Sequence, residues 1–258
     1  MLPETVASYE HLCKSSAMNI SLLTNRDLAS HIVLSRLIGL LSGHRLSIFI
    51  SEKVGRDQSL PQPLMALAEF EKQLIAASPH SFDSLARQAG CRLQGFADID
   101  NRVNGTQGIE RIKATEPDVI LSIRFGLIIR EPIIAIPKYG VINLHSGLLP
   151  EYKGVMASFW SMLNKEVELG TTLHWVTNRK IDTGHVISTR SQSVQSGLSY
   201  MNQVLSLYGP GVEQIRDAIE NIEQLAVTPR PDLPKGHYYS FPSTEQIDRF
   251  ESAGWRLF

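Results

Sequence analysis

The stretch "GVINLHSGLLPEYKG", residues 140–154, begins like a buried strand and ends in a proline and a Lys-Gly turn. Asn143 and His145 stand two residues apart at the point where the apolar run breaks. Residues i and i+2 of a strand project to the same face, so the two side chains converge if the strand persists to His145. Ligands of open α/β sheets bind outside the carboxyl ends of the strands. The stretch therefore predicts a polar site at the end of a core strand.

Strands and helices alternate in the chain before this stretch. Apolar strands are expected at 18–25 and 45–54, and the residues between them show helical spacing that closes on Gly43. Strand, helix and strand in this order form the unit of a parallel sheet. Residues 118–123, "DVILSI", are almost wholly apolar, as in a central strand covered on both faces. We predict an α/β fold with a mostly parallel sheet flanked by helices.

Helical periodicity recurs in three further segments. Residues 63–77 form a helix inside an excursion from the core fold at about 55–82. Residues 198–225 are largely helical, with a helix boundary expected at the Gly-Pro-Gly sequence of 209–211. A Ser-Thr pair before Glu245 predicts a last short helix, followed by an aromatic tail.

Composition excludes several classes of function. Of the 258 residues, 43% are hydrophobic and 20% charged, which suffices to bury a sizeable core. The net charge of −1 favours neither nucleic acid nor an anionic membrane as a partner. No apolar run approaches the roughly 18–20 residues of a membrane span, and the N-terminus does not resemble a signal peptide. Two cysteines cannot form a zinc cage, and we expect no metal and a cytoplasmic location.

Asp182, in "KIDTGHV", completes a chemical set with the first two residues. An amide and an imidazole can donate hydrogen bonds to a developing oxyanion. A carboxylate can orient water or the imidazole and can help to move protons. The sequence has no G-x-S-x-G motif and no cysteine near this set, which suits direct transfer of an acyl unit to an outside amine. An N-x-H pair at a strand end and an Asp-Thr-Gly turn also occur for purely structural reasons, so both readings stay open here.

Three segments resemble one known family. "GVINLHSGLLPEYKG" is similar to the signature of the formyltransferases that use 10-formyltetrahydrofolate, roughly N-[IVL]-H-x-S-L-L-P-x-[YF]-[RK]-G. "GTTLHWVTNRKIDTGHVI" resembles the family's second block, and "RFGLIIREPIIAIPKYG" resembles the segment that precedes the signature. The resemblance implies a Rossmann-like catalytic domain at 18–228 with the helical insertion at about 55–82. Residues 1–17 and 229–258 are then an N-terminal and a short C-terminal extension.

The resemblance also implies roles for individual residues. Asn143 holds the formyl oxygen, His145 stabilises the oxyanion, and Asp182 positions water or His145 and relays the proton that leaves the amine. The formyl donor is 10-formyltetrahydrofolate, and the loop 124–129 and the turn 178–182 flank its pterin. The expected folate-binding residues are Arg124, Phe125, Gly126, Leu127, Ile128, His174, Lys180 and Ile181. One departure lies inside the signature, where Gly147 replaces the usual serine.

Two of the acceptors that members of this family formylate can be set aside from the sequence. Enzymes acting on glycinamide ribonucleotide carry a Gly-rich turn after the first strand, but the turn here, "TNRDLAS", has no glycine. Methionyl-tRNA formyltransferases carry a further basic domain, whereas about 30 residues follow position 228 here. The remaining acceptors are an amino sugar nucleotide or a hydroxyornithine-type siderophore precursor. Acceptor choice is expected to lie in residues 55–82 or in the first 17 residues.

Other functions stay open. A formyltetrahydrofolate hydrolase would use similar blocks, although such enzymes carry a regulatory domain ahead of the first strand, where about 17 residues stand here. A glycinamide ribonucleotide formyltransferase and a catalytically silent folate-binding protein also remain as alternatives. The partner expected is a small-molecule amine, and a homodimer is left open.

Overall fold

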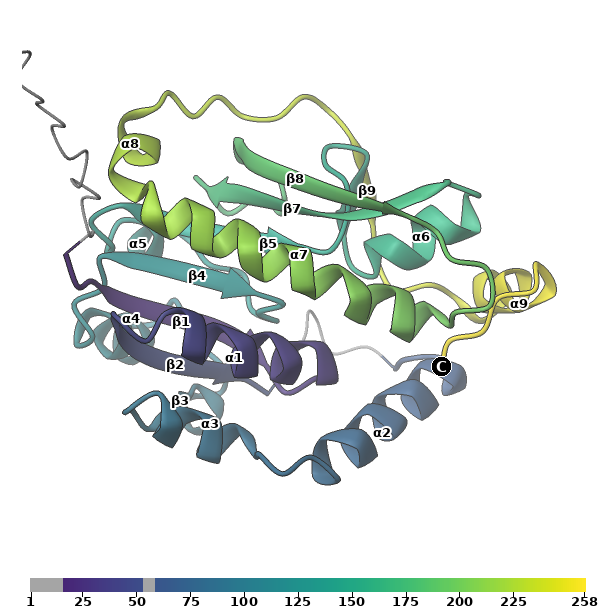
Figure 1. Ribbon diagram of the computed structural model, residues 1–258, viewed down its shortest axis with the longest axis horizontal. Coiled ribbons are helices and arrows are strands. Elements are labelled where there is room, and N and C mark those ends of the chain that lie inside the picture. Colours follow the sequence, from purple (N-terminus) through teal and green to yellow (C-terminus); the bar gives the residue numbers. More distant parts are fainter. Residues whose placement is uncertain (1–15, 53–58) are drawn as a thin grey trace, which may run out of the picture.

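The computed structural model describes residues 16–52 and 59–258, and a mostly parallel sheet forms its centre (Figure 1). The strands of this sheet are β1 (Asn19–Asn25), β2 (Arg45–Ser51), β3 (Leu93–Gly95), β4 (Val119–Ile123), β5 (Gly140–His145), β7 (Glu168–Val176) and β8 (Val186–Ser193). Their spatial order is β3-β2-β1-β4-β5-β7-β8. The first five in this order pair in parallel, whereas β7 runs antiparallel to β5 and to β8. The predicted α/β fold is confirmed.

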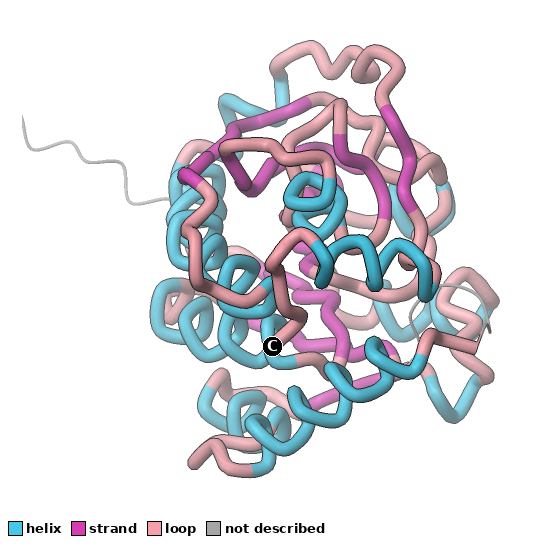
Figure 2. Tube along the Cα trace, turned by 90° about the vertical axis from the view of Figure 1, so that its right-hand side faces the viewer, coloured by secondary structure: helices cyan, strands magenta, loops and turns pink. Residues whose placement is uncertain are grey.

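Helices cover both faces of the sheet (Figure 2). They are α1 (Leu28–Leu40), α2 (Gln62–Ala76), α3 (Phe82–Gln88), α4 (Thr106–Lys113), α5 (Glu131–Ile134), α6 (Ala157–Leu163), α7 (Tyr200–Glu220), α8 (Ile222–Val227) and α9 (Thr244–Ser252). Neighbouring strand residues point to opposite faces, so Leu22 packs in the core under α1 and α7, and Leu23 packs in the core with α4 and α5. All five residues of β4 are buried, as expected for a strand covered on both sides.

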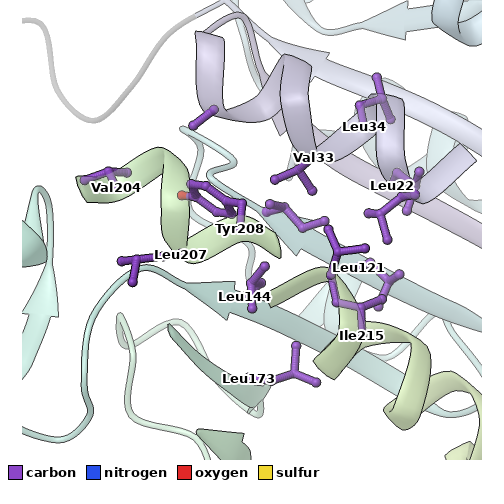
Figure 3. Packing of buried hydrophobic residues seen from close by; sticks show 14 of the residues in the cluster. Leu22, Val33, Leu34, Leu121, Leu144, Leu173, Val204, Leu207, Tyr208 and Ile215 are labelled. Atoms are coloured by element: carbon purple, nitrogen blue, oxygen red, sulfur yellow. The ribbon is translucent and has the colours of Figure 1, made fainter. Parts of the chain in front are cut away.

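The core between α1, α7 and the sheet fixes the position of both helices (Figure 3). Val33 of α1 and Tyr208 and Ile215 of α7 are buried in it together with Leu121 and Leu144 of the strands. Burial of each such aliphatic side chain stabilises the fold by about 1.5–3 kcal/mol. This packing holds the first turn of α1 and the first half of α7 beside the carboxyl ends of β1 and β4.

The helix boundary predicted at 209–211 is wrong, because α7 continues through Pro210 without a break. A proline inside a helix removes one hydrogen bond and glycine has poor helix propensity, so the sequence argued against this continuity. The helix instead packs closely on its neighbours. A Cβ added to Gly211 would lie 3.0 Å from Leu144 Cδ2, and one added to Gly209 would lie 3.0 Å from Arg36 Nη1. Tertiary packing therefore outweighs local propensity here.

The last part of the chain, residues 229–258, runs back over the strands and loops of the second half of the sheet. The Arg230 guanidinium lies over the Trp175 ring, 3.4 Å from its centroid, and the Leu233 N–H donates to the Thr183 carbonyl at 2.8 Å. β9 (His237–Tyr239) then pairs in parallel with β6 (Tyr152–Gly154). α9 begins at the predicted place, with Ser243 and Gln246 forming a capping box.

Two stretches, residues 1–15 and 53–58, lie outside the described residues. Most of the expected N-terminal extension and the start of the 55–82 excursion fall in them. The helix expected at 63–77 is present as α2. Across residues 16–52 and 59–258, no helix combines the length and the apolar character that crossing a membrane requires.

Candidate active site

The polar pair of β5 lies beside β7, where the parallel part of the sheet meets the antiparallel part. Asn143 stands directly opposite His174 in the β5–β7 register, and its Nδ2 lies 3.1 Å from His174 Nε2. His145 ends the strand and is buried. A register irregularity between Leu173 and His174 in the β7–β8 pairing lies at the same place, and such bulges are frequent next to active sites.

Asp182 reaches these residues from the turn between β7 and β8. Its backbone is left-handed, with a φ of 53°, and its side chain is buried. Its Oδ1 lies 3.3 Å from His174 Nε2, and its Oδ2 lies 3.5 Å from His145 Nδ1. Oδ2 also accepts a hydrogen bond of 2.8 Å from the Gly154 N–H. The structure therefore brings the three predicted catalytic residues together, with His174 as a fourth member.

The charge state of Asp182 follows from these contacts. Burial by itself raises the pKa of a carboxyl group. At Asp182 the His145 ring, the His174 ring and the Gly154 N–H outweigh burial and lower the pKa to about 2. The carboxylate is therefore ionised at neutral pH and is able to stabilise a proton on either imidazole.

Backbone carbonyls orient both imidazole rings. His145 Nε2 lies 2.7 Å from the Tyr152 carbonyl oxygen, and His174 Nδ1 lies 2.9 Å from that of Trp175. A carbonyl oxygen can only accept, so we assign a hydrogen to each of these nitrogens. The second nitrogen of each ring then faces Asp182. When such a ring takes up a proton, its contact with Asp182 becomes an ion pair.

The structure explains why Gly147 stands where the family signature has a serine. A Cβ at Gly147 would lie 2.5 Å from the Ala157 Cβ and 2.6 Å from His145 Nε2. Any side chain at this position would displace the histidine or the α6 residue that packs beside it. Gly147 thus keeps room for His145, and its carbonyl accepts from the Thr172 hydroxyl at 2.7 Å.

The loop after β4 is expected to border the folate, but its first side chain, that of Arg124, is already bonded to other residues of the protein. Arg124 Nε pairs with Asp27 Oδ2 at 2.5 Å, and Nη1 donates to the Tyr208 hydroxyl at 3.1 Å. The Gly126 N–H donates to Ser51 Oγ at 3.0 Å. The side chain of Ile128 is 52% exposed. An exposed apolar side chain on this loop can contact a flat ring.

The other expected folate residues are divided between core and surface. Phe125 and Leu127 pack against the core under α4 and α5. Lys180 and Ile181 are exposed on the turn that carries Asp182, and the Lys180 N–H donates to Asn178 Oδ1 at 2.8 Å. His174 does not lie on this exposed surface: only 2% of it is exposed, and it contacts Asn143 and Asp182.

Two sets of groups near the site were not predicted from the sequence. One is the Gly154 N–H on Asp182, which depends on a contact between two loops. The other consists of Asp27 and Tyr208, which contact Arg124. The only sequence signal for this second set was Asp27 at the start of the α1 helical pattern, read there as part of the turn after the first strand.

The arrangement supplies hydrogen-bond donors, a buried carboxylate and two imidazoles, and within residues 16–52 and 59–258 no serine or cysteine side chain hydrogen-bonds to either imidazole. It suits proton transfer and stabilisation of an oxyanion. Among the described residues, no group of three or more His, Cys, Asp or Glu side chains could hold a metal ion. Fold and site together define an open α/β domain with two imidazoles and a buried carboxylate near the carboxyl end of β5.

Residues 79–202 match the family model described as formyl transferase, in agreement with the resemblance seen in the sequence. One similar protein is a methionyl-tRNA formyltransferase from Thermodesulfovibrio yellowstonii, 30% identical over 125 residues, which are 48% of this chain and 40% of that protein. The chain spans less than half the length of the curated relatives it matches.

Solved structures share the fold at low sequence identity. Glycinamide ribonucleotide transformylase 1 from Symbiobacterium toebii has a TM-score of 0.60 and 16% identity, covering 84% of this chain and 93% of that one. The formyltransferase PseJ from Anoxybacillus kamchatkensis was crystallised with a nucleotide-linked formamido sugar and tetrahydrofolate. It has a TM-score of 0.52 and 19% identity, covering 92% and 93% of the two chains.

Proposed function

We propose that this protein transfers the formyl group of 10-formyltetrahydrofolate to the amine or hydroxylamine nitrogen of a small-molecule acceptor. The observation that carries the proposal is the convergence of Asn143, His145 and Asp182 inside the segment that matches the family. The folate donor is supported by the tetrahydrofolate bound to PseJ and by the open loop after β4.

The acceptor nitrogen attacks the formyl carbon directly. A carbon–nitrogen bond forms, the carbonyl oxygen becomes an oxyanion, and the attacking nitrogen must lose a proton. Asn143 donates to His174 through one hydrogen of its amide, which leaves the second for the formyl oxygen. The His145 Nε2–H donates to the Tyr152 carbonyl, so it serves as a second donor to the oxyanion once the ring turns away from that carbonyl.

Proton handling falls to His145 and Asp182. A proton taken up at His145 Nδ1 converts its 3.5 Å contact with Asp182 Oδ2 into an ion pair. The tetrahedral intermediate then collapses: the bond from the formyl carbon to the folate nitrogen breaks, and that nitrogen receives a proton. The products are the N-formylated acceptor and tetrahydrofolate. No covalent enzyme intermediate is needed.

The acceptor classes kept from the sequence are an amino sugar nucleotide and a hydroxyornithine-type amine. A role of the 55–82 excursion in acceptor choice is supported by the packing of its helix α2 against α1, the helix that follows β1. Replacing residues 55–80 by a short linker should change acceptor binding and leave folate binding intact. Loss of folate binding in that variant would contradict this assignment.

The proposal is tested by mixing the protein with 10-formyltetrahydrofolate, with and without a panel of amines, and following the release of tetrahydrofolate. The panel contains a nucleotide-linked amino sugar, ornithine, N-hydroxyornithine and glycinamide ribonucleotide. Amine-dependent release is the expected result. Release without any amine would identify a hydrolase, and no release with any amine would leave a silent folate-binding protein.

A further inference from the structure

The chain after α8 has no role in the mechanism above, although it passes close to the reaction centre. Residues 232–240, here called the strap, run along the β7–β8 side of the sheet and contain β9 (Figure 1). β9 pairs in parallel with β6, a strand of only three residues that lies outside the seven-stranded sheet. The position of β6 as a strand therefore depends on the strap.

β6 carries two backbone groups that hold the catalytic pair, His145 and Asp182. The Tyr152 carbonyl accepts from His145 Nε2 at 2.7 Å, and the Gly154 N–H donates to Asp182 Oδ2 at 2.8 Å. The first contact leaves His145 Nδ1 facing Asp182, and the second holds the carboxylate oxygen that this nitrogen faces. A shift of β6 would therefore move both members of the catalytic pair.

The opposite edge of β6 binds the strap. In a strand, the backbone N–H and C=O groups of successive residues point alternately to its two edges. Tyr152 and Gly154 direct theirs to the catalytic pair, so Lys153 and Val155 direct theirs to β9. The Val155 N–H indeed donates to the Tyr239 carbonyl at 2.9 Å. One edge of β6 is thus held by the strap, and the other edge holds the catalytic pair.

One aromatic side chain fastens the strap to β6 and to the helix that follows it. The Tyr239 ring stacks on the Tyr152 ring, with 5.5 Å between the centroids, and on the Trp160 ring of α6 at 4.9 Å. Trp160 Nε1 donates to the Ser240 carbonyl at 3.0 Å, which fixes the same part of the strap. Tyr239 thus packs directly on the residue whose carbonyl orients His145.

The strap also contacts the turn that carries Asp182. The Leu233 N–H donates at 2.8 Å to the carbonyl of Thr183, the residue after Asp182. Lys153 of β6 is buried, and its ammonium group donates to the Pro234 carbonyl at 3.1 Å. Two consecutive residues of the strap therefore bind the two segments between which the Asp182 carboxylate is held.

The close approach of the strap to the loop before β6 requires a glycine. A Cβ at Gly236 would lie 1.6 Å from the Pro150 carbonyl oxygen and 2.5 Å from the carbonyl carbon. Any side chain at this position would push the strap and the loop apart, because backbone can come this close only to a residue without a Cβ. Gly236 therefore offers a second way to displace the strap, separate from Tyr239.

We propose, on the basis of the function proposed above, that the strap positions the catalytic pair and that Tyr239 is its principal positioning residue. Tyr239 acts through β6, which keeps the His145 ring and the Asp182 carboxylate in the arrangement that takes up the proton of the attacking nitrogen. Loss of the Tyr239 ring should therefore slow the chemical step. Binding of the folate donor, which is expected at the loop after β4, should change little.

The first measurement separates kcat from KM in the formyl-transfer assay. Tyr239→Ala should lower kcat at least tenfold and change the KM for 10-formyltetrahydrofolate less than threefold. Tyr239→Phe keeps the stacked ring and loses only the hydroxyl, which accepts from Asn164 at 3.3 Å, so its kcat should stay within twofold of wild type. Tyr139→Ala is the matched control. Tyr139 precedes β5 at the end opposite to His145, and this variant should keep the wild-type kcat.

The second measurement is amide hydrogen exchange by NMR, which is independent of turnover and reports directly on the Gly154 N–H. In Tyr239→Ala, exchange at Gly154 should become faster, and this increase should exceed any increase at Leu121 of the central strand β4 at least tenfold. Gly236→Ala displaces the strap at another point and should give the same local increase at Gly154. It also provides the test if Tyr239→Ala does not fold.

The outcomes separate this inference from the proposed function. A kcat of Tyr239→Ala within twofold of wild type, an equal loss in Tyr239→Phe, or an equal increase in exchange at Gly154 and Leu121 would overturn the inference. Amine-dependent release of tetrahydrofolate by the wild-type protein would leave the proposed function intact in each of these cases. Absence of release with every amine would overturn the proposed function, and a local increase in exchange at Gly154 would then still support the hold of the strap on β6.

Discussion

Replacement of Asp182 by asparagine removes one charge and one proton acceptor from the centre of the site. The change keeps the size of the side chain. Asp182 has a φ of 53°, a left-handed conformation that asparagine adopts more readily than most residues. The amide oxygen can still accept the Gly154 N–H. We therefore expect Asp182→Asn to fold with its backbone unchanged.

The loss of stability follows from the pKa. The folded value is about 2 and the ordinary value 3.8, and the difference corresponds to about 2 kcal/mol of stability. Because the folded pKa is the lower one, this contribution is complete above the ordinary value and is lost as the pH falls to about 2. Asp182→Asn should therefore be less stable than wild type by about 2 kcal/mol at pH 7. The difference should shrink steadily as the pH falls from 5 toward 2.

Turnover should fall roughly a hundredfold or more, as is usual when a group that handles the proton is removed. Urea unfolding across this pH range and amine-dependent release of tetrahydrofolate measure the two effects. Asp248→Asn, an identical change at an exposed position of α9, serves as the control and should alter neither. Near-normal turnover in Asp182→Asn would refute the catalytic reasoning, and a stability difference independent of pH would refute the electrostatic reasoning.

Two further variants test the surroundings of the site. Gly147→Ala should lose about 1–3 kcal/mol in urea unfolding and reduce turnover, because its Cβ would lie 2.6 Å from His145 Nε2. Gly43→Ala is its control, since a Cβ there would meet nothing within 4 Å; equal stabilities would contradict this explanation. Arg230→Met should lose about 1–2 kcal/mol and change tryptophan fluorescence, because it removes the stacking on Trp175 and the bond to the Tyr139 carbonyl. Unchanged fluorescence and stability would argue against that contact.

The parts of the fold that depend on local pattern could be predicted from the sequence. β1, α1 and β2 follow from apolar periodicity, and α9 follows from its capping residues. The continuity of α7 could not be predicted, because it depends on the fit of Gly211 against Leu144 of a distant strand. Local propensity carries no information about such a contact.

The candidate site likewise has one part that the sequence predicts and another that it does not. The convergence of Asn143 and His145 follows from strand alternation within one segment. The position of His174 opposite Asn143 depends on the antiparallel register of β5 and β7, which one sequence does not determine. The contacts of Arg124 with Asp27 and Tyr208 join three separate segments, so they become visible only in the folded chain.

The most direct test of the central claim follows the formyl carbon itself. 10-Formyltetrahydrofolate labelled at the formyl group is incubated with the protein and an accepted amine, and the products are separated. We predict that the label appears in the N-formylated amine in a one-to-one ratio with released tetrahydrofolate, and that Asp182→Asn abolishes most of this transfer. Label recovered as free formate, in the same amount with or without the amine, would contradict the account.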